Sequence, residues 1–333
     1  MRRDDVGREP MRAIVCRGFG PPDVLELREG EKPAPADDEV LIRVRATTVT
    51  AGDCEFRRMD FPIYLRIPLR VYAGLRNGDG TILGQELAGE VESVGGEVSR
   101  FEPGDRVFGA TLFRFGAYAE YATLPDTHPI ARIPDGVSYE EAATIPVGGI
   151  NGLHFLRKAN VRPSDAVLIN GAGGSIGTYA VQVAKSIGAE VTAVDSTGKL
   201  DVLRAVGADH VVDYTREDFA RRGETYDAIV DVVGTSDFSR SVGCLERNGR
   251  YVLGNPRLRG VARALWTTTV TGKRVAFEPA SPRTEDLEDL AGLVESGEVT
   301  PVIDRRYPLG RVADAHRYVE SGRKTGNVVV TVE

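Results

Sequence analysis

A glycine-rich loop between an apolar run and a periodic helix is the feature that most constrains the fold of this chain. The segment VLINGAGGSIGTYAVQVAK (167–185) contains Gly171, Gly173, Gly174 and Gly177. Glycine reaches positive φ without a Cβ clash, so the chain can turn tightly there and leave its backbone open to close approach. The helix N-terminus adds unpaired donors and partial positive charge, which suit a phosphate. The loop therefore predicts a diphosphate-binding turn, with Gly177 allowing the helix to pack on the sheet.

The residues around this loop extend the pattern to a whole dinucleotide-binding unit. Apolar residues within 175–188 fall on one face of a helix, and Asp195 ends the next strand. An acidic side chain at that place accepts a hydrogen bond from the adenosine ribose 2′-hydroxyl, which favours NAD. Ser196, Thr197 and Lys199 follow directly, and hydroxyls with a cation suit the 2′-phosphate of NADP. These residues leave the choice between NAD and NADP open, and a structural glycine turn without a ligand is the minor alternative.

Two different residue patterns along the chain predict two domains. Short strands with closely spaced Gly and Pro fill residues 12–135, and VLIRVRATTV (40–49) alternates apolar and polar side chains as a half-buried strand does. This texture is typical of a barrel-like, mostly antiparallel domain. From Asp165 onward strands alternate with helices, which indicates a parallel sheet. Helices and strands over 287–332 then close the chain.

The composition places the chain among ordinary globular proteins. Its 333 residues exceed what one small core needs, and 41% are hydrophobic and 27% charged. The net charge of −7 does not predict a basic face that would bind nucleic acid or an anionic membrane. Three scattered cysteines, Cys16, Cys54 and Cys244, cannot form a paired disulfide framework, and no run of about 18 apolar residues predicts a membrane span. We therefore expect a cytoplasmic protein with reduced, buried thiols.

A series of ordered segments then resembles one enzyme superfamily. From about Met11 to Val332 the chain is similar to the medium-chain dehydrogenase/reductase superfamily, in its zinc-independent quinone oxidoreductase (zeta-crystallin-like) branch. Besides the glycine loop, the segments that carry the resemblance are PPDVLELREGEKPAP, LGQELAGEVESVGGEVSRFEPGDRVFG, GAYAEYATLP, EEAATIPVGGINGLHFL, GADHVVDYTREDF and GRKTGNVVVTV. The resemblance implies an α/β fold with a GroES-like β-barrel catalytic domain and a Rossmann domain with a doubly wound parallel sheet. We place the first at 1–135 and 299–333, with 1–10 as a flexible extension, and the second at 136–298.

The resemblance also assigns residues to the cofactor, position by position. Those implied around the pyrophosphate are Gly171, Ala172, Gly174, Ser175, Ile176 and Gly177. Those implied around the adenosine phosphate are Ser196, Thr197, Lys199 and Tyr214, while Asp195 replaces the small residue usual in NADPH-specific members. Asn151 is implied near the cofactor, Val233, Gly254 and Asn255 at strand ends that face the nicotinamide, and Asn327 as a contact from the closing segment. NADP(H) is slightly favoured, with NAD(H) as the alternative.

The positions of the metal ligands in zinc-dependent relatives carry poor donors in this chain. Those relatives have a Cys at the position of Thr50, a His at the position of Gln85 and a third ligand near Gly149. A hydroxyl, an amide and a glycine do not supply the thiolate, imidazole or carboxylate that Zn²⁺ prefers. Residues 105–125 lack the cysteines of a structural zinc lobe, and the four histidines show no ligand spacing. We expect no metal, with Cys54 as a buried thiol and His316 as a packed or solvated histidine.

Two carboxylates beside Thr50 are candidates for the substrate pocket. Asp53 fits the family's Asp after the Thr50 position, where orienting the loop is the favoured role and direct catalysis the alternative. Glu55 stands where some relatives have a pocket tyrosine, and a solvated glutamate is the favoured alternative. The arginine-rich insertion at 56–76 fits a lid over an apolar substrate equally as well as a surface helix or a dimer contact.

These features lead to one preferred function and two alternatives. Without a Lewis acid, simple alcohols are harder to oxidise, whereas quinones and enones delocalise negative charge onto an oxygen that a few hydrogen bonds can stabilise. We therefore predict an NAD(P)H-dependent, zinc-independent oxidoreductase acting on a small apolar or conjugated carbonyl compound. An alcohol dehydrogenase of the same superfamily and a non-catalytic dinucleotide-binding protein are the alternatives. The partners expected are a homodimer mate, with the strand at 274–281 at the sheet edge, and neither nucleic acid nor membrane.

Overall fold

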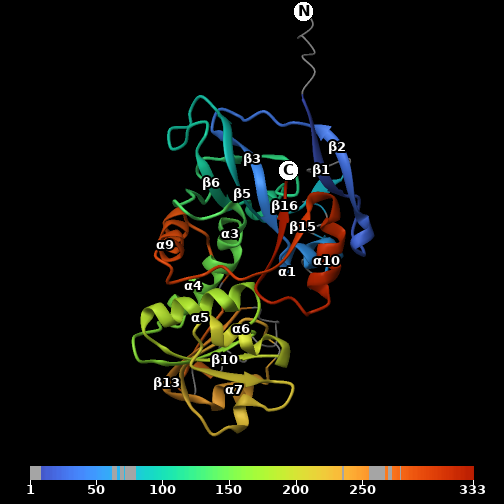
Figure 1. Ribbon diagram of the computed structural model, residues 1–333. Helices are drawn as coiled ribbons and strands as arrows, with labels where there is room; N and C mark the ends of the chain where they lie inside the picture. The colour runs from blue at the N-terminus through green and yellow to red at the C-terminus, as the bar shows by residue number, and fades with distance from the viewer. Residues whose placement is uncertain are drawn as a thin grey trace, which may run out of the picture. The chain divides into compact units, whose positions relative to one another are not determined.

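The chain divides into two compact units, each formed from more than one segment (Figure 1). The computed structural model describes residues 9–61, 66–67, 71, 80–234, 236–254, 267–268, 272–277 and 279–333. The first unit comprises Met1–Pro146, Arg283–Glu288 and Ile303–Glu333, and the second comprises Val147–Pro282 and Asp289–Val302. Most of the extension expected at 1–10, most of the insertion at 56–76 and Asn255 lie outside the described residues.

The second unit contains a six-stranded parallel sheet, as the strand–helix alternation predicts. Its strands stand in the order β11-β10-β9-β12-β13-β14, which in chain order is the 3-2-1-4-5-6 arrangement of a doubly wound fold. They are β9 (Ala166–Asn170), β10 (Glu190–Asp195), β11 (His210–Asp213), β12 (Tyr226–Asp231), β13 (Leu245–Leu253) and β14 (Arg274–Ala276). The strand order reverses between β9 and β12, so the carboxyl ends of these two strands mark the switch point where such sheets bind ligands.

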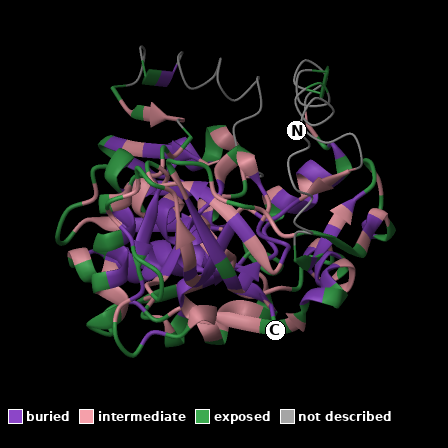
Figure 2. Cartoon of the chain, turned by 90° about the horizontal axis from the view of Figure 1, so that it is seen from above, coloured by how far each residue is buried: buried purple, intermediate pink, exposed green. Residues whose placement is uncertain are grey.

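Helices and short turns complete the parallel unit. They are α4 (Ile150–Lys158), α5 (Ser175–Ile187), η4 (Thr197–Lys199), α6 (Leu200–Ala205), η5 (Phe219–Arg221) and α7 (Phe238–Gly243). Helix α5 ends as glycine caps do, because Gly188 adopts a φ of 93° and its N–H bonds the Ala184 carbonyl. In Figure 2 the central strands fall in the buried class, and residues of the exposed class lie on outer helix faces and loops.

The first unit is mostly antiparallel, in agreement with the texture of residues 12–135. A seven-stranded sheet runs β15-β16-β3-β5-β6-β8, with β7 paired to β3, and a three-stranded sheet runs β2-β1-β4. The strands are β1 (Pro10–Cys16), β2 (Leu25–Glu31), β3 (Glu39–Thr48), β4 (Thr81–Ile82), β5 (Glu86–Val94), β6 (Arg106–Ala110), β7 (Tyr121–Pro125), β8 (Ile130–Arg132), β15 (Ile303–Pro308) and β16 (Asn327–Thr331). Strands β15 and β16 form the parallel pair of this unit.

Helices of the first unit begin where the sequence supplies caps. They are η1 (Pro22–Val24), α1 (Ala51–Arg58), η2 (Leu112–Arg114), α3 (Tyr139–Ala142), η6 (Leu309–Arg311) and α10 (Val312–Glu320). Two further helical segments, the π-helical turn Ile145–Gly149 and α9 (Thr284–Glu295), each contain residues of both units. Ser138 and Glu141 form a reciprocal capping box that starts α3. No helix among the described residues is both long and apolar enough to cross a membrane.

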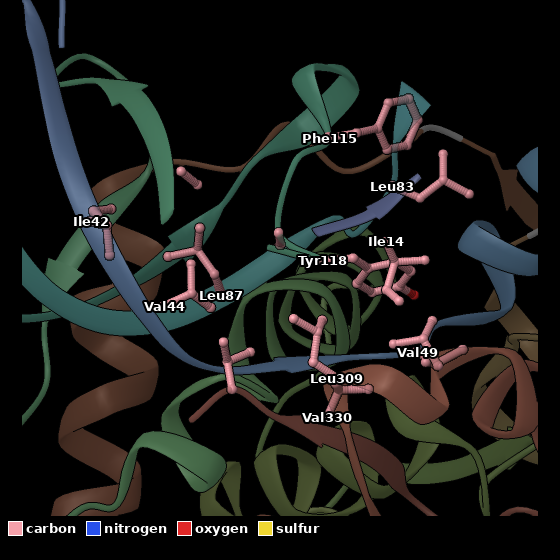
Figure 3. Close-up of a cluster of buried hydrophobic side chains, with 14 of the residues drawn as sticks. Ile14, Ile42, Val44, Val49, Leu83, Leu87, Phe115, Tyr118, Leu309 and Val330 are labelled. Carbon is pink, nitrogen blue, oxygen red and sulfur yellow. The ribbon is translucent and has the colours of Figure 1, made fainter. Parts of the chain in front are cut away.

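The core of the first unit gathers around β3 (Figure 3). Val40, Ile42 and Val44 of β3 are at most 1% exposed, and they belong to one apolar cluster with Leu87 and Val330. The expected alternation holds at 42–46, where Arg43 is exposed and Arg45 half-buried, but it fails at the two ends of the strand, because Leu41, Thr47 and Thr48 are buried as well. Both edges of β3 are paired, by β5 and by β7 and β16, and the Thr47 and Thr48 hydroxyls bond Glu86 of β5.

The edge of the parallel sheet also differs from the sequence expectation. Strand β14 covers only 274–276 of the strand expected at 274–281. It stands last in the described sheet, and the Val275 N–H donates to the Thr268 hydroxyl at 3.2 Å. Part of the edge that was expected to meet a second copy is therefore already bonded within the chain.

A glycine on β5 provides the test of this packing. A Cβ on Gly89 would overlap the Arg43 carbonyl oxygen and lie 2.9 Å from its carbon, next to the register shift between Val44 and Ala46. We expect Gly89→Ala to lower the free energy of unfolding by about 1–3 kcal/mol, because β3 and β5 must move apart. The exposed Gly96, where a Cβ would meet nothing within 4 Å, is the matched control. Urea unfolding of both variants measures the effect, and equal midpoints would contradict it.

Candidate functional site

The glycine loop connects β9 to α5 at the switch point of the parallel sheet. Gly171 adopts a φ of 82°, which a side chain would strain. A Cβ on Gly177 would lie 2.5 Å from the Ala172 Cα, so glycine alone allows this close contact between helix and loop. Gly174 begins α5 without a side-chain cap, and no acidic residue occupies the first turn. A Cβ on Gly174 would meet only the Gly171 carbonyl, at 3.6 Å. The helix N-terminus is thus built for an external acceptor.

Backbone hydrogen bonds divide the loop into a structural half and an open half. The N–H groups of Gly171 and Ala172 donate to the Val194 carbonyl at 3.0 and 3.1 Å, and Ala172 is fully buried. These two residues therefore shape the turn and have their donors committed to β10. Ser175 and Ile176 are half-buried in the first turn of α5, where helical geometry leaves N–H groups without an intrahelical acceptor.

Asp195 is engaged within the protein at the end of β10. Its Oδ2 accepts from the Gly173 N–H at 2.8 Å and its Oδ1 from the Ser196 N–H at 2.8 Å. The Lys199 ammonium lies 3.3 Å from Oδ1, and both side chains of this pair are nearly buried. The stem of Lys199 covers Gly173, where a Cβ would lie 2.5 Å from the lysine Cδ. Asp195 and Lys199 together fasten the loop to β10.

The end of β11 supplies the neighbouring polar groups. Asp213 stands opposite Asp195 in the β10–β11 ladder, and its carboxylate accepts from the hydroxyls of Thr197 and Thr215. The Arg216 guanidinium lies 3.4 Å from the same carboxylate and is largely exposed. Tyr214 is 60% exposed beside them. The sequence-predicted Ser196, Thr197, Lys199 and Tyr214 are therefore brought to one edge of the sheet.

The remaining residues predicted on the parallel unit lie at the carboxyl ends of β12 and β13 and on α4. Val233 is 46% exposed, and its methyl groups lie over Gly171, where a Cβ would meet them at 3.0 Å. Gly254 follows β13 and donates its N–H to the Asp231 carbonyl at 2.9 Å. The Asn151 amide donates to the Val147 carbonyl at 2.8 Å within its own helix segment.

A buried network at the same edge was missed by the sequence reasoning. The Asp231 carboxylate ends β12 and accepts from the Asn170 amide at 2.9 Å, the Gly234 N–H at 2.8 Å and the Tyr251 hydroxyl at 2.7 Å. It fixes the turn that carries Val233. The signal available in the sequence was an acidic residue at the end of an otherwise apolar strand, DAIVDVVG.

On the first unit, Thr50 and Asp53 form a reciprocal capping box at the start of α1. The Thr50 hydroxyl and N–H donate to Asp53 Oδ2 at 2.6 and 2.9 Å, and the Asp53 N–H donates to the Thr50 hydroxyl at 3.0 Å. The Gln85 amide reaches the same hydroxyl at 3.4 Å. Gln85 also lies over Gly52, where a Cβ would approach its amide nitrogen to 2.7 Å. The two polar residues at the ligand positions of zinc-dependent relatives therefore contact each other.

Asp53 is wholly buried, and its electrostatics follow from that. Loss of hydration raises the pKa of this carboxyl to about 6, although Thr50, Tyr118 and Gln85 act in the opposite direction. Its Oδ1 has no hydrogen-bond partner in the described part of the chain. Glu55, the other predicted carboxylate, is half-buried on α1, and burial raises its pKa too. The two candidates thus differ, because only Asp53 is enclosed.

Three further side chains extend this network into the core. His316 of α10 is fully buried, with Nε2 3.2 Å from the Tyr118 hydroxyl and Nδ1 3.3 Å from both Arg57 Nε and Cys54 Sγ. Burial and the Arg57 charge lower the His316 pKa to about 3, so the imidazole is neutral. Burial raises the Cys54 pKa to about 12, which leaves an unreactive thiol, as expected. Arg57 is wholly buried and paired with Glu320.

Asn327, the histidines that could bind a metal and the two remaining cysteines lie within the described residues. Asn327 begins β16 and is 1% exposed. Among the described residues, no three His, Cys, Asp or Glu side chains lie close enough together to hold a metal ion. Cys16 and Cys244 are free and buried, which confirms the expectation of buried thiols.

Comparison with known proteins identifies the superfamily of this chain. Residues 36–135 match the alcohol dehydrogenase GroES-like domain family, and residues 206–330 match the zinc-binding dehydrogenase family. A quinone oxidoreductase of Pseudomonas aeruginosa is 32% identical, with 96% of this chain and 99% of that protein covered. The chain belongs to the medium-chain dehydrogenase/reductase superfamily, in its quinone oxidoreductase branch.

Two further members of this superfamily show how broad the likeness is. The NADPH-dependent alkenal/one oxidoreductase of Arabidopsis thaliana chloroplasts is 31% identical, with 96% of this chain and 79% of that protein covered. The solved quinone oxidoreductase of Coxiella burnetii superposes with a TM-score of 0.87 at 29% identity and covers 98% of this chain and 100% of its own. The superfamily membership and the α/β fold expected from the sequence are thereby confirmed.

The buried Asp53 predicts a pH-dependent stability. Its folded pKa of about 6 lies above the ordinary value of 3.8, so the folded state binds this proton more tightly than the unfolded state. The resulting stabilisation is complete below about pH 4 and is lost as the pH rises through 6, a change of roughly 3 kcal/mol at most. We expect Asp53→Asn to remove this loss while an amide oxygen still caps α1. Urea unfolding from pH 4 to 7 measures it, and the exposed Asp37→Asn is the control. Parallel pH dependences of wild type and Asp53→Asn would contradict the prediction.

Proposed function

We propose that this protein uses NAD(P)H to reduce a quinone or an enone-type acceptor without a catalytic metal. The observation that carries the proposal is the Thr50–Gln85–Asp53 cluster, an uncharged donor pair in front of one buried carboxyl. The similarity to proteins named quinone oxidoreductase and alkenal/one oxidoreductase supports the same reaction class.

Donor chemistry is the reason for proposing a metal-free site. The Thr50 hydroxyl already contacts Asp53 and Gln85, and neither a hydroxyl nor an amide is a good ligand for Zn²⁺. Gly149, near the third ligand position of zinc-dependent relatives, offers no side chain. An acceptor whose negative charge is spread over a conjugated system needs only hydrogen bonds at its oxygen, and this cluster can supply them.

The parallel unit fits the nicotinamide dinucleotide that this chemistry requires. When bound, the nicotinamide would supply the hydride. Gly171 and Ala172 shape the turn, and Gly174, Ser175, Ile176 and Gly177 offer the pyrophosphate a helix N-terminus without a side-chain cap. The residues proposed toward the nicotinamide are Val233 and Gly254, with Asn151 near the cofactor, and Asn255 and Asn327 stay predictions from the resemblance. A homodimer also stays a prediction.

The engagement of Asp195 favours NADP(H) over NAD(H). A ribose 2′-hydroxyl would have to compete with the Gly173 and Ser196 N–H groups for this carboxylate. The Lys199 ammonium neutralises it and keeps further donors for a phosphate, next to the Ser196 and Thr197 hydroxyls. The acidic residue that argues for NAD in the sequence is thus a fastening for the loop.

Two alternatives predict different behaviour. An alcohol dehydrogenase of the same superfamily would need a Lewis acid or an equivalent beside Thr50, so it would hold a metal ion or oxidise alcohols. A non-catalytic dinucleotide-binding protein would bind NADPH and turn nothing over. The Thr50–Asp53 cluster supports the reductase, because it sets a hydroxyl against a buried carboxyl where a conjugated acceptor would need a hydrogen bond at its oxygen.

Purified protein should oxidise NADPH with 1,4-benzoquinones or with α,β-unsaturated ketones, and chelators should leave the rate unchanged. The spectrophotometric loss of NADPH measures the rate, and elemental analysis measures bound zinc. Simple alcohols with NADP⁺ serve as the comparison. Turnover of alcohols that stops on chelation would contradict the metal-free reductase, and cofactor binding without any turnover would favour the non-catalytic alternative.

Lys199 should decide the cofactor preference. We expect NADPH to raise the melting temperature more than NADH at equal concentration. Lys199→Ala should weaken NADPH binding about 10- to 100-fold, which is the range of a charge-assisted hydrogen bond, and should change NADH binding little. Lys158→Ala removes the same charge from the end of α4 and serves as the control. Equal losses for both cofactors would show that Lys199 acts through loop structure.

A further inference from the structure

We propose that Asp53 protonates the reduced substrate through the Thr50 hydroxyl, and that Arg57, His316 and Tyr118 form a directed hydrogen-bond chain that orients this acid. The proposal rests on the proposed function, because it supplies the proton that reduction of a carbonyl-conjugated acceptor requires. Its parts all belong to the first unit, on α1, on α10 and in the segment that leads to β7. Thr50 would be the catalytic residue that touches substrate, and the three chain members would be positioning residues.

The direction of the chain follows from which atoms can donate. A guanidinium only donates, so the His316 Nδ1 that lies 3.3 Å from Arg57 Nε is an acceptor. The Cys54 thiol, also 3.3 Å from Nδ1, is a second donor to the same atom. The neutral imidazole then carries its proton on Nε2 and donates it to the Tyr118 hydroxyl at 3.2 Å. Because the Tyr118 oxygen accepts from His316, the hydroxyl proton of Tyr118 can be donated to a different acceptor.

Asp53 is the acceptor toward which this proton can turn. Its Oδ2 receives the Thr50 hydroxyl and N–H, whereas its Oδ1 is buried and has no partner in the described residues. Tyr118 lies close enough to Asp53 to lower the pKa of that carboxyl. Figure 3 shows the Tyr118 ring among apolar side chains of the core. In this proposal, the chain Arg57–His316–Tyr118 turns the Tyr118 hydroxyl toward Asp53 when that carboxyl is ionised.

The proton transfer balances without any further reactant. Reduction leaves a negative oxygen on the substrate. The Thr50 hydroxyl gives its proton to that oxygen and takes the proton of the neutral Asp53 carboxyl, so one O–H bond forms on the substrate and the Asp53 O–H bond breaks. The negative charge ends on Asp53, where Tyr118 stabilises it. After product release a proton from solvent returns to Asp53 through the Thr50 hydroxyl, and no group of the chain changes its oxidation state.

The surroundings of Asp53 set the sign of the pH dependence. The charged groups on α1, on α10 and on β5 include Arg57 and Arg58, which both pair with Glu320, and Glu86, which bonds the Thr48 hydroxyl. Burial outweighs the donors and raises the Asp53 pKa to about 6. Because the acid form is the active one, kcat/KM should fall as the pH rises through that value.

The first test compares Thr50→Val with Thr50→Ser, using NADPH and a benzoquinone that the wild type reduces. The Val variant has the shape of Thr without the hydroxyl, and we expect its kcat to fall at least 100-fold, because general acid catalysis contributes about 10²–10⁴. The Ser variant keeps the hydroxyl, so its kcat should stay within about 10-fold of wild type, well above the kcat expected of the Val variant. NADPH-induced melting shifts should be equal in both. Equal kcat values for the two variants would overturn the relay.

The second test shifts the pKa of Asp53 without removing its carboxyl group. Tyr118→Phe deletes the donor to ionised Asp53, so the upper pH limit of kcat/KM should shift upward, by about one unit for a lost charge-assisted hydrogen bond. Tyr121→Phe on β7 is the matched control. Infrared difference spectra between each protein and its Asp53→Asn counterpart follow the protonated carboxyl without cofactor, and its titration should shift in the same direction. An unshifted titration and an unshifted profile in Tyr118→Phe would overturn the chain.

The two proposals fail in distinguishable ways. Absence of turnover with every acceptor would overturn the proposed function, even if the infrared titration moved as expected. Turnover by wild type together with an active Thr50→Val variant would overturn the relay and leave the reductase in place. If Tyr118→Phe does not fold, the comparison of Thr50→Val with Thr50→Ser still decides the relay.

Discussion

The burial of one carboxyl at the start of α1 governs how the first unit is organised. Asp53 closes the turn after β3 by capping the helix, and its own hydration is replaced by Thr50 and, more weakly, by Gln85 and Tyr118. A fully buried carboxyl is tolerated only where such donors compensate it. Helix α10 contributes the next layer, since His316 and Glu320 hold Arg57 in the interior. The end of β3, α1 and α10 are therefore tied together by polar contacts inside an otherwise apolar core.

Local signals in the sequence predicted the elements of the second unit well. The glycine loop, the helical period after it and the residue at the end of β10 are all encoded within about thirty residues, and they appear in the structure as β9, α5 and β10. The burial of β3 was not predictable in this way, because its polar Thr47 and Thr48 are covered by strands that are distant in sequence.

The site was predictable in its parts and not in its connections. Sequence alone pointed to Asp53, Asp195 and Lys199 but left the choice between a ribose 2′-hydroxyl and a 2′-phosphate open at Asp195, and it did not predict that this carboxylate bonds the Gly173 N–H. His316 could not be joined to Cys54 and Arg57, because roughly 260 residues separate them and no local pattern encodes the contact. Whether a polar group serves a ligand or its own fold depends on such long-range neighbours.

The fastening of Gly173 by Asp195 and Lys199 bears on how this protein could diverge. In many dinucleotide enzymes, exchanging the acidic residue after the second strand is a local change, since that side chain faces the ligand alone. Here the same exchange would also free the loop N–H and uncover the lysine stem that packs on it. Redesign of the coenzyme choice would therefore have to rebuild the loop together with the charge, and single substitutions at this position would trade selectivity against loop order.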